Sequence, residues 1–162
     1  MSNLKKRVIL ALIIVIAALC AVALYIWVTQ PSLRPYQRSF GFSTKGLKIK
    51  ITDHYYEEAF QDPWSGYVAR VSGKVEGSVF DPALMDEGLS SMIRNTLELN
   101  NQDMAAAKRE PLFKEKAGAS YKARVLIRES DTSPDHWKDR LFIIYSPSEE
   151  LYYIFYESFV SN

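Results

Sequence analysis

The chain has 162 residues with 20 basic and 19 acidic side chains, and its formal net charge is +1. The only charged residues among the first 30 are Lys5, Lys6 and Arg7, so the remainder has 17 basic and 19 acidic side chains and a net charge of −2. This remainder lacks the positive potential that nucleic-acid binding needs, which excludes nucleic acid from the expected partners. The single cysteine, Cys20, excludes disulfides and thiolate chemistry from everything after it.

The N-terminal segment is the most apolar part of the chain. Residues 8–28 form a run of 21 residues without a charge, glycine or proline, about 31 Å long as a helix. It predicts a single transmembrane helix, with residues 1–7 in the cytoplasm and the C-terminal domain outside a cell membrane, in a bacterial envelope. The residues expected at the two membrane interfaces are Lys5, Lys6 and Arg7 before the helix and Tyr25 and Trp27 at its outer end.

Two other interpretations of this segment are a cleavable signal peptide and a lipoprotein signal. The sequence Ala21-Val22-Ala23 has the small residues of a cleavage site, although the apolar run continues past it. Leu19 precedes Cys20 where lipoprotein processing needs a small residue, which argues against lipidation.

Residues 29–46 predict a linker, because they contain two prolines, two glycines and no sustained period. The domain of residues 47–162 then opens with alternating apolar residues at 47–52, followed by a longer alternation over 67–79. Three further strands are expected near the C-terminus, at 121–128, 141–145 and 151–159.

One long helix is expected from Pro82 to Leu97, started by the capping residue Asp81. A short helix is predicted at 103–108. These elements favour an α+β domain with a mainly antiparallel sheet of about five strands packed on one long helix. The stripe expected to pack on the sheet consists of Leu84, Met85, Leu89, Met92, Ile93 and Leu97.

Two histidine-containing segments are candidate metal sites. Residues 54–58 resemble an H-x-x-E-H motif but have Glu58 in place of the second histidine. The loop containing Asp131, Asp135, His136 and Asp139 is rich in oxygen ligands but lacks the spacing of an EF-hand. We therefore expect no metal and no cofactor, and a solvated turn at each place.

Aromatic residues are dense in the last strand, which has no polar face between Tyr152 and Tyr156. Such a strand either lies in the centre of the sheet with both faces covered or exposes one face to a partner. The residues that would bind a partner in the second case are Tyr152, Tyr153, Tyr156 and Trp137.

Nucleophile elbows, phosphate loops and dinucleotide fingerprints are absent from the sequence. We therefore expect a non-enzymatic accessory protein that binds another membrane or envelope protein, as a complex subunit, assembly factor or inhibitor. The alternative is a ligand-binding or sensing domain in which a curved sheet and a helix enclose a pocket lined by Tyr and Trp. A hydrolase that uses carboxylates ranks third.

Overall fold

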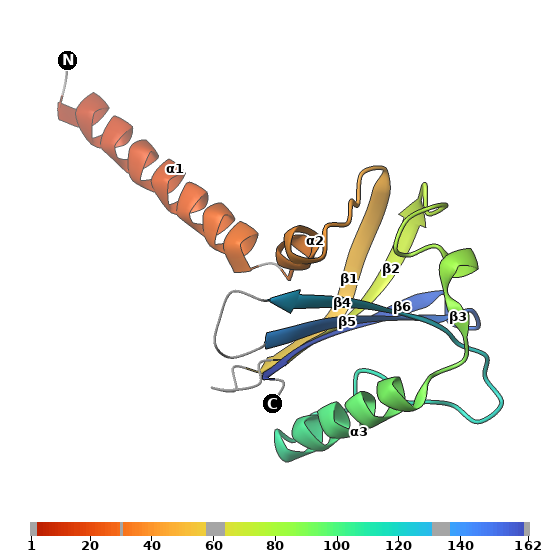
Figure 1. Ribbon diagram of the computed structural model, residues 1–162. Coiled ribbons are helices and arrows are strands. Elements are labelled where there is room, and N and C mark those ends of the chain that lie inside the picture. Colours follow the sequence, from red (N-terminus) through yellow and green to blue (C-terminus); the bar gives the residue numbers. More distant parts are fainter. Residues whose placement is uncertain (1–2, 30, 58–63, 131–136, 161–162) are drawn as a thin grey trace. The chain divides into compact units, whose positions relative to one another are not determined.

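The computed structural model describes residues 3–29, 31–57, 64–130 and 137–160. Within these ranges it has three α-helices, one 3₁₀ helix and a six-stranded antiparallel sheet, which is an α+β fold (Figure 1). The chain divides into two compact units, Met1–Ser32 and Leu33–Asn162, and each is described here by itself.

The first unit contains the helix α1 (Asn3–Thr29). Among the described residues, no helix combines the length and apolar character that crossing a membrane requires. The prediction of a single-pass transmembrane helix over residues 8–28, and with it the predicted location in a cell membrane, is therefore wrong.

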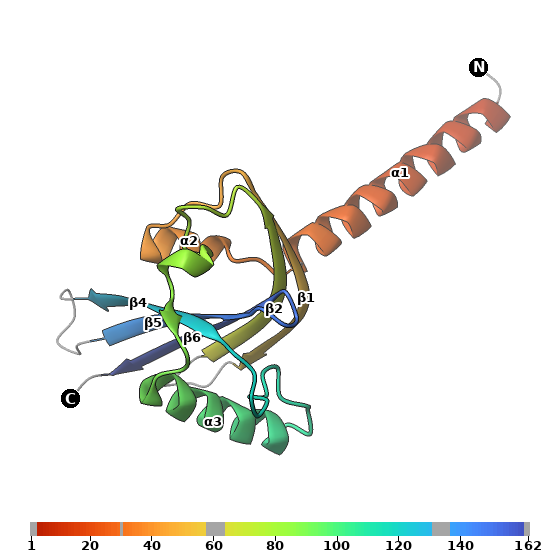
Figure 2. The same ribbon diagram turned by 90° about the vertical axis from the view of Figure 1, so that its right-hand side faces the viewer.

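The second unit is built on a sheet with the strand order β1-β2-β6-β5-β4-β3, in which all neighbours are antiparallel. Figures 1 and 2 show that β1 and β2 cross the direction of β4 and β5 steeply, as in a strongly twisted sheet. The strands are β1 (Leu47–Glu57), β2 (Trp64–Gly73), β3 (Asp86–Glu87), β4 (Lys122–Ser130), β5 (Trp137–Ser146) and β6 (Leu151–Val160).

Strand β6 lies between β2 and β5 and contributes buried side chains to both faces of the sheet. Because successive strand residues point to opposite faces, Tyr153 and Phe155 enter one apolar core, while Tyr152 and Ile154 enter a second. The C-terminal strand is therefore central, with both of its faces covered.

Different segments cover the two faces (Figure 2). The helix α2 (Arg34–Phe40) and the segment before the 3₁₀ helix η1 (Pro82–Leu84) cover the face that holds Tyr152, through Tyr36 and Phe80. The helix α3 (Ser91–Ala106) covers the opposite face, which we call the α3 face, and shares it with residues 107–121.

The predicted packing of about five strands on one long helix is wrong, because no single long helix packs on the six-stranded sheet. On the α3 face, Leu112, Phe113 and Tyr121 fill the core beside α3. The long helix also begins later than expected. Asp81 caps only the three residues of η1, and the cap of α3 is Ser90, whose hydroxyl accepts a hydrogen bond from the Ile93 amide at 3.3 Å.

The remaining boundaries differ in smaller ways. The predicted strand of residues 67–79 ends at Gly73, where φ is +97°, and the predicted helix at 103–108 is the last turn of α3. A side chain at Gly73 would place its Cβ atom 2.4 Å from the Gly46 carbonyl oxygen. At Gly77, where φ is +73°, a Cβ atom would meet nothing within 4 Å.

We therefore expect Gly73→Ala to destabilise the protein by about 3 kcal/mol or more, because backbone strain adds to a steric clash. The matched change Gly77→Ala carries the backbone strain alone and should cost about 1–2 kcal/mol. Urea unfolding of both variants measures their free energies of unfolding. Equal losses in the two variants would show that the close contact between Gly73 and Gly46 adds nothing to the cost of a side chain at Gly73.

Candidate functional site

An open groove of about 610 Å³ lies between α3 and one end of the sheet. It is bordered by the helix on one side and by β2, β5 and β6 on the other. We call it the α3 groove. Its lining residues are Trp64, Met92, Asn95, Thr96, Leu99, Asn100, Asp103, Arg140, Glu157 and Ser158.

The helix presents two neighbouring stripes of side chains. The inner stripe places Ile93, Leu97 and Met104 in the core, each less than 9% exposed. The stripe beside it carries Met92 and Leu99, which are 40% and 60% exposed. Met92 precedes the core residue Ile93 by one position, so the two stripes lie side by side around the helix. The apolar side chains of α3 therefore extend from the core to the rim of the groove.

The floor of the groove comes from three adjacent strands in register. Trp64 of β2 lies opposite Glu157 of β6, which in turn lies opposite Arg140 of β5. Trp64 is 5% exposed, and Arg140 donates a hydrogen bond from Nη1 to Glu157 Oε1 at 3.1 Å. The guanidinium and the carboxylate neutralise each other, so the floor is polar without carrying a net charge.

Asn100 is the unusual residue of the groove. Its side chain lies on the core stripe of α3 and is only 4% exposed, yet its Nδ2 group has no hydrogen-bond partner within the described structure. A buried donor without an acceptor costs about 1–3 kcal/mol, so the native state carries a penalty at this position. Asn100 is also one of the residues that line the groove.

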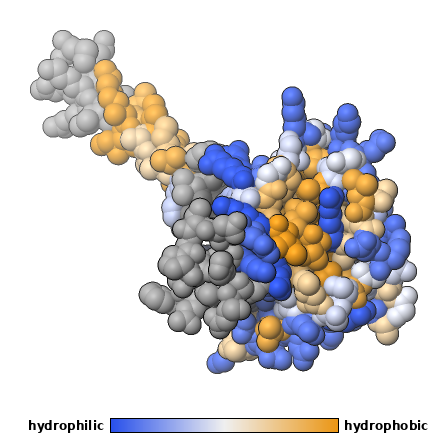
Figure 3. All heavy atoms as spheres, viewed as in Figure 1, coloured by the Kyte–Doolittle hydropathy of each residue, from blue (hydrophilic) through white to orange (hydrophobic). Residues whose placement is uncertain are grey.

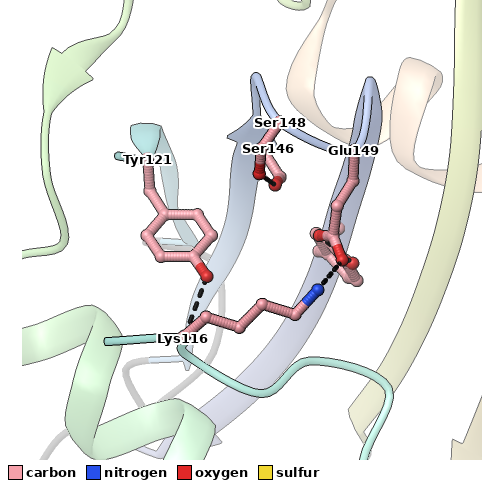
Figure 4. Close-up of polar contacts among 6 residues, drawn as sticks. Lys116, Tyr121, Ser146, Ser148 and Glu149 are labelled. Atoms are coloured by element: carbon pink, nitrogen blue, oxygen red, sulfur yellow. Dashed lines mark hydrogen bonds and ion pairs between the residues drawn. The ribbon is translucent and has the colours of Figure 1, made fainter. Parts of the chain in front are cut away.

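A second polar cluster joins residues 107–121 to the turn between β5 and β6 (Figure 4). Glu149 pairs with the Lys116 ammonium group and accepts a hydrogen bond from Tyr153 Oη at 2.7 Å. The Lys116 amide donates to Tyr121 Oη at 2.9 Å. The hydrogen bond from Lys116 lowers the pKa of Glu149, and burial raises the pKa of Tyr153. Because Glu149 is engaged by Lys116 and Tyr153, this cluster acts as a structural clamp.

The aromatic residues predicted to bind a partner are not brought together on a surface. Tyr152 and Tyr153 are 4% and 7% exposed and lie in opposite cores, and Tyr156 is half-buried. The side chain of Trp137 lies outside the described residues. A role of these residues in partner binding stays a prediction.

The predicted interface residues of the N-terminal helix are described only in part. The side chain of Tyr25 is 70% exposed, whereas those of Lys5, Lys6, Arg7 and Trp27 are not among the described ones.

The two histidine segments do not form a metal site in the described part of the chain, where no group of three potential ligands lies together. His54 lies on the edge strand β1 instead of a helix, so its neighbours alternate between the two faces of the sheet. Asp139 accepts a hydrogen bond from Ser158 Oγ at 2.7 Å. Glu58, Asp131, Asp135 and His136 lie outside the described residues.

The α3 groove was not predicted from the sequence. The predicted helix, which starts at Pro82, places Met92 on the buried stripe, whereas Met92 is 40% exposed. One signal was available: Asn100 interrupts the apolar spacing of Ile93, Leu97 and Met104 with a polar side chain. The pairing of Trp64, Glu157 and Arg140 joins residues far apart in the chain and has no local signal.

The clamp makes stability depend on pH. Because the pKa of Glu149 is lower in the folded than in the unfolded chain, its contribution is present above the ordinary carboxyl value of 4.5 and is lost as the pH falls through the folded value. We expect Glu149→Gln to lower the free energy of unfolding by up to about 1 kcal/mol at pH 7. Below pH 4.5 the stability of this variant should fall less steeply with pH than that of the wild type. Urea unfolding from pH 7 to pH 3 tests this, and parallel curves for both proteins would contradict it.

Comparisons with known proteins do not assign the chain to a group. No protein-family model, no curated protein and no solved structure matches it. The geometry of the α3 groove therefore carries the functional proposal.

Proposed function

We propose that the protein is a non-catalytic binding module that takes a polypeptide segment of a partner protein into the α3 groove. The observation that carries the proposal is the buried, unpartnered Nδ2 group of Asn100 at the groove. Polypeptides offer a carbonyl acceptor at every residue, so an extended segment can satisfy this donor without a particular side chain.

The composition of the groove supports a protein partner over a charged small molecule. Trp, Met and Arg are enriched at protein interfaces, and the groove combines a buried Trp64, an exposed Met92 and a half-buried Arg140. Leu99 adds an exposed aliphatic rim. Since Glu157 already neutralises Arg140, a strongly anionic ligand finds no free cation there.

The apolar surface continues beyond the groove along the sheet. Ile127 of β4 lies opposite Arg140 in register and is 54% exposed. A segment that crosses from Leu99 to Ile127 would bury two exposed aliphatic side chains around the ion pair. This arrangement, with apolar contacts around a central polar pair, is typical of small protein interfaces.

The polar residues of the groove favour binding over catalysis. Its two described carboxylates are Asp103 and Glu157, and Glu157 is held by Arg140. The only hydroxyls that line the groove belong to Thr96 and Ser158, and Ser158 donates its hydrogen bond to Asp139. The lining residues include no histidine, lysine or cysteine, which are the side chains that most often serve as base or nucleophile.

Peptides selected from a displayed random library against the full chain provide the first test. We expect Leu99→Glu to weaken binding of the selected peptides at least tenfold, because a charge replaces the apolar rim. The matched control is Leu84→Glu on η1, since Leu84 is 53% exposed and lies outside the groove. Equal losses in both variants, or no enriched peptides, would refute the proposal.

Asn100→Leu separates binding from stability. Leucine has a similar volume and a higher helix propensity, and it removes the unsatisfied donor, so the free energy of unfolding should rise by about 1–2 kcal/mol. Binding of the same peptides should weaken at least fivefold. A variant that is less stable than the wild type would show that the amide serves the fold.

A further inference from the structure

The sheet has a long open edge on β4, because β3 pairs with only the first two residues of that strand. β3 consists of Asp86–Glu87, which pair with Ala123 and Lys122, whereas β4 continues to Ser130. On its other side, β4 pairs with β5 along its whole length without a register shift. The outer side of residues 124–130 therefore has no neighbouring strand in the described part of the chain. We call this stretch the β4 edge.

The contact with β3 shows which backbone groups point outward from the β4 edge. The Gly88 amide donates a 2.8 Å hydrogen bond to the Tyr121 carbonyl oxygen, so the backbone of Tyr121 faces the side of β3. The N–H and C=O groups of successive residues in an antiparallel strand point to alternate sides. Those of Val125, Ile127 and Glu129 therefore point outward, and no hydrogen bond from another described segment reaches them. These backbone groups can pair with a further strand.

The other edge of the sheet, strand β1, is protected in a way that the β4 edge is not. The register of β1 shifts between Ile51 and Asp53, and Lys48 and Lys50 are exposed before this bulge. Bulges and lysines are features by which proteins prevent the addition of strands to an edge. The β4 edge has no register shift and carries Ile127, which is 54% exposed. The β4 edge is therefore the more open of the two to strand addition.

The side chains of the β4 edge differ between the two faces of the sheet. Val125 lies opposite Phe142 of the core beneath α3, which places Val125 and Ile127 on the α3 face. Arg124 and Arg128 occupy alternate positions and therefore lie on the other face. None of the six ion pairs between described residues includes either arginine. A strand added at this edge would meet apolar side chains on one face and cations on the other.

The charge of the arginines also decides between a partner protein and a second copy of the chain. Asp139 lies opposite Arg128, but its Oδ1 atom accepts hydrogen bonds from Tyr156 at 3.2 Å and Ser158 at 2.7 Å. One carboxylate thus stands against two arginines on this face. Two copies of β4 in antiparallel pairing would bring four arginines to one face, and like charges in such pairs are destabilising. The edge therefore favours an acidic partner strand.

We propose that the β4 edge binds an extended segment of a partner protein in which acidic residues alternate with apolar ones. The segment adds a strand to the sheet through the outward backbone groups of β4. Its apolar residues cover Val125 and Ile127, and its carboxylates face Arg124 and Arg128. Figure 3 shows apolar surface beside hydrophilic residues in the middle of the view, where Figure 1 draws β4 in front of β1. The site goes beyond the α3 groove, because no residue of β4 lines that groove.

NMR measurement of amide hydrogen exchange, with the full chain titrated by a short capped peptide that alternates Glu and Val, tests the proposal. We expect the amides of Val125, Ile127 and Glu129 to exchange more slowly in the complex, because they gain acceptors. Those of Leu126 and Arg128 should change little, because they already face β5. A peptide with Lys in place of Glu, or with all Glu before all Val, should bind roughly tenfold more weakly.

Two results would overturn the proposal. The first is unchanged exchange at Val125, Ile127 and Glu129 in a saturated complex, or equal binding of the three peptides. The second is protection of these amides without peptide that rises with protein concentration, which would show that a second copy of the chain occupies the edge.

The double variant Arg124→Gln/Arg128→Gln should bind the Glu-Val peptide roughly tenfold more weakly, because it removes the cations that face the carboxylates. The control Lys48→Gln/Lys50→Gln removes two charges from the other edge strand and should bind within about twofold of the wild type. The amide spectra of both variants report whether they are folded. Equal losses in the two variants, or full binding by the first, would contradict the assignment.

Discussion

The fold depends on one constraint, which is that β6 is apolar on both of its faces. Tyr152 and Ile154 point to one side of the sheet, and Tyr153 and Phe155 to the other. Such a strand is stable only where both faces are removed from water, since each buried aromatic contributes about 2 kcal/mol or more. The chain meets this requirement by placing β6 in the centre of the sheet and sending separate segments over each face.

The segments that cover the two faces of the sheet differ in how much of each face they cover, and the candidate site lies where one of them ends. On one face, Tyr36 of α2 is anchored by a hydrogen bond to Ser65 at 2.6 Å and by ring contacts with Tyr67 and Tyr156. On the other face, the cover is shared between α3 and residues 107–121, which the clamp of Lys116 and Glu149 holds in place. The end of this second cover leaves the α3 groove open, with Asn100 beside it.

Local patterns in the sequence predicted the α+β class and strands that overlap β1, β2, β4, β5 and β6, because alternation and turn residues act over a few positions. They did not predict β3, which lies where a helix was expected. They misplaced the start of the long helix. Asp81-Pro82 is a strong helix start, but Gly88, whose φ is +81°, is not in a right-handed helical conformation. The long helix starts only after Ser90, which provides a second cap. The choice between two caps is made by packing, which no local pattern contains.

The candidate site was beyond prediction for a related reason. The strand order places Trp64 beside Glu157 and Arg140, and such pairing follows from the whole sheet and not from any segment. The aromatic residues that drew attention in the sequence, Tyr152 and Tyr153, turned out to be buried. The candidate site consists instead of an exposed aliphatic residue, Leu99, and a buried polar residue, Asn100. Neither residue belongs to a recognisable sequence motif.

The most direct test of the central claim is NMR observation of the Asn100 side-chain amide in the full chain bound to a peptide selected for binding. If the α3 groove is the recognition site, one of the two Nδ2 protons should shift downfield and exchange more slowly with water on binding, because it gains an acceptor. Unchanged resonances in a saturated complex would show that the peptide binds elsewhere, and would contradict the account of the groove.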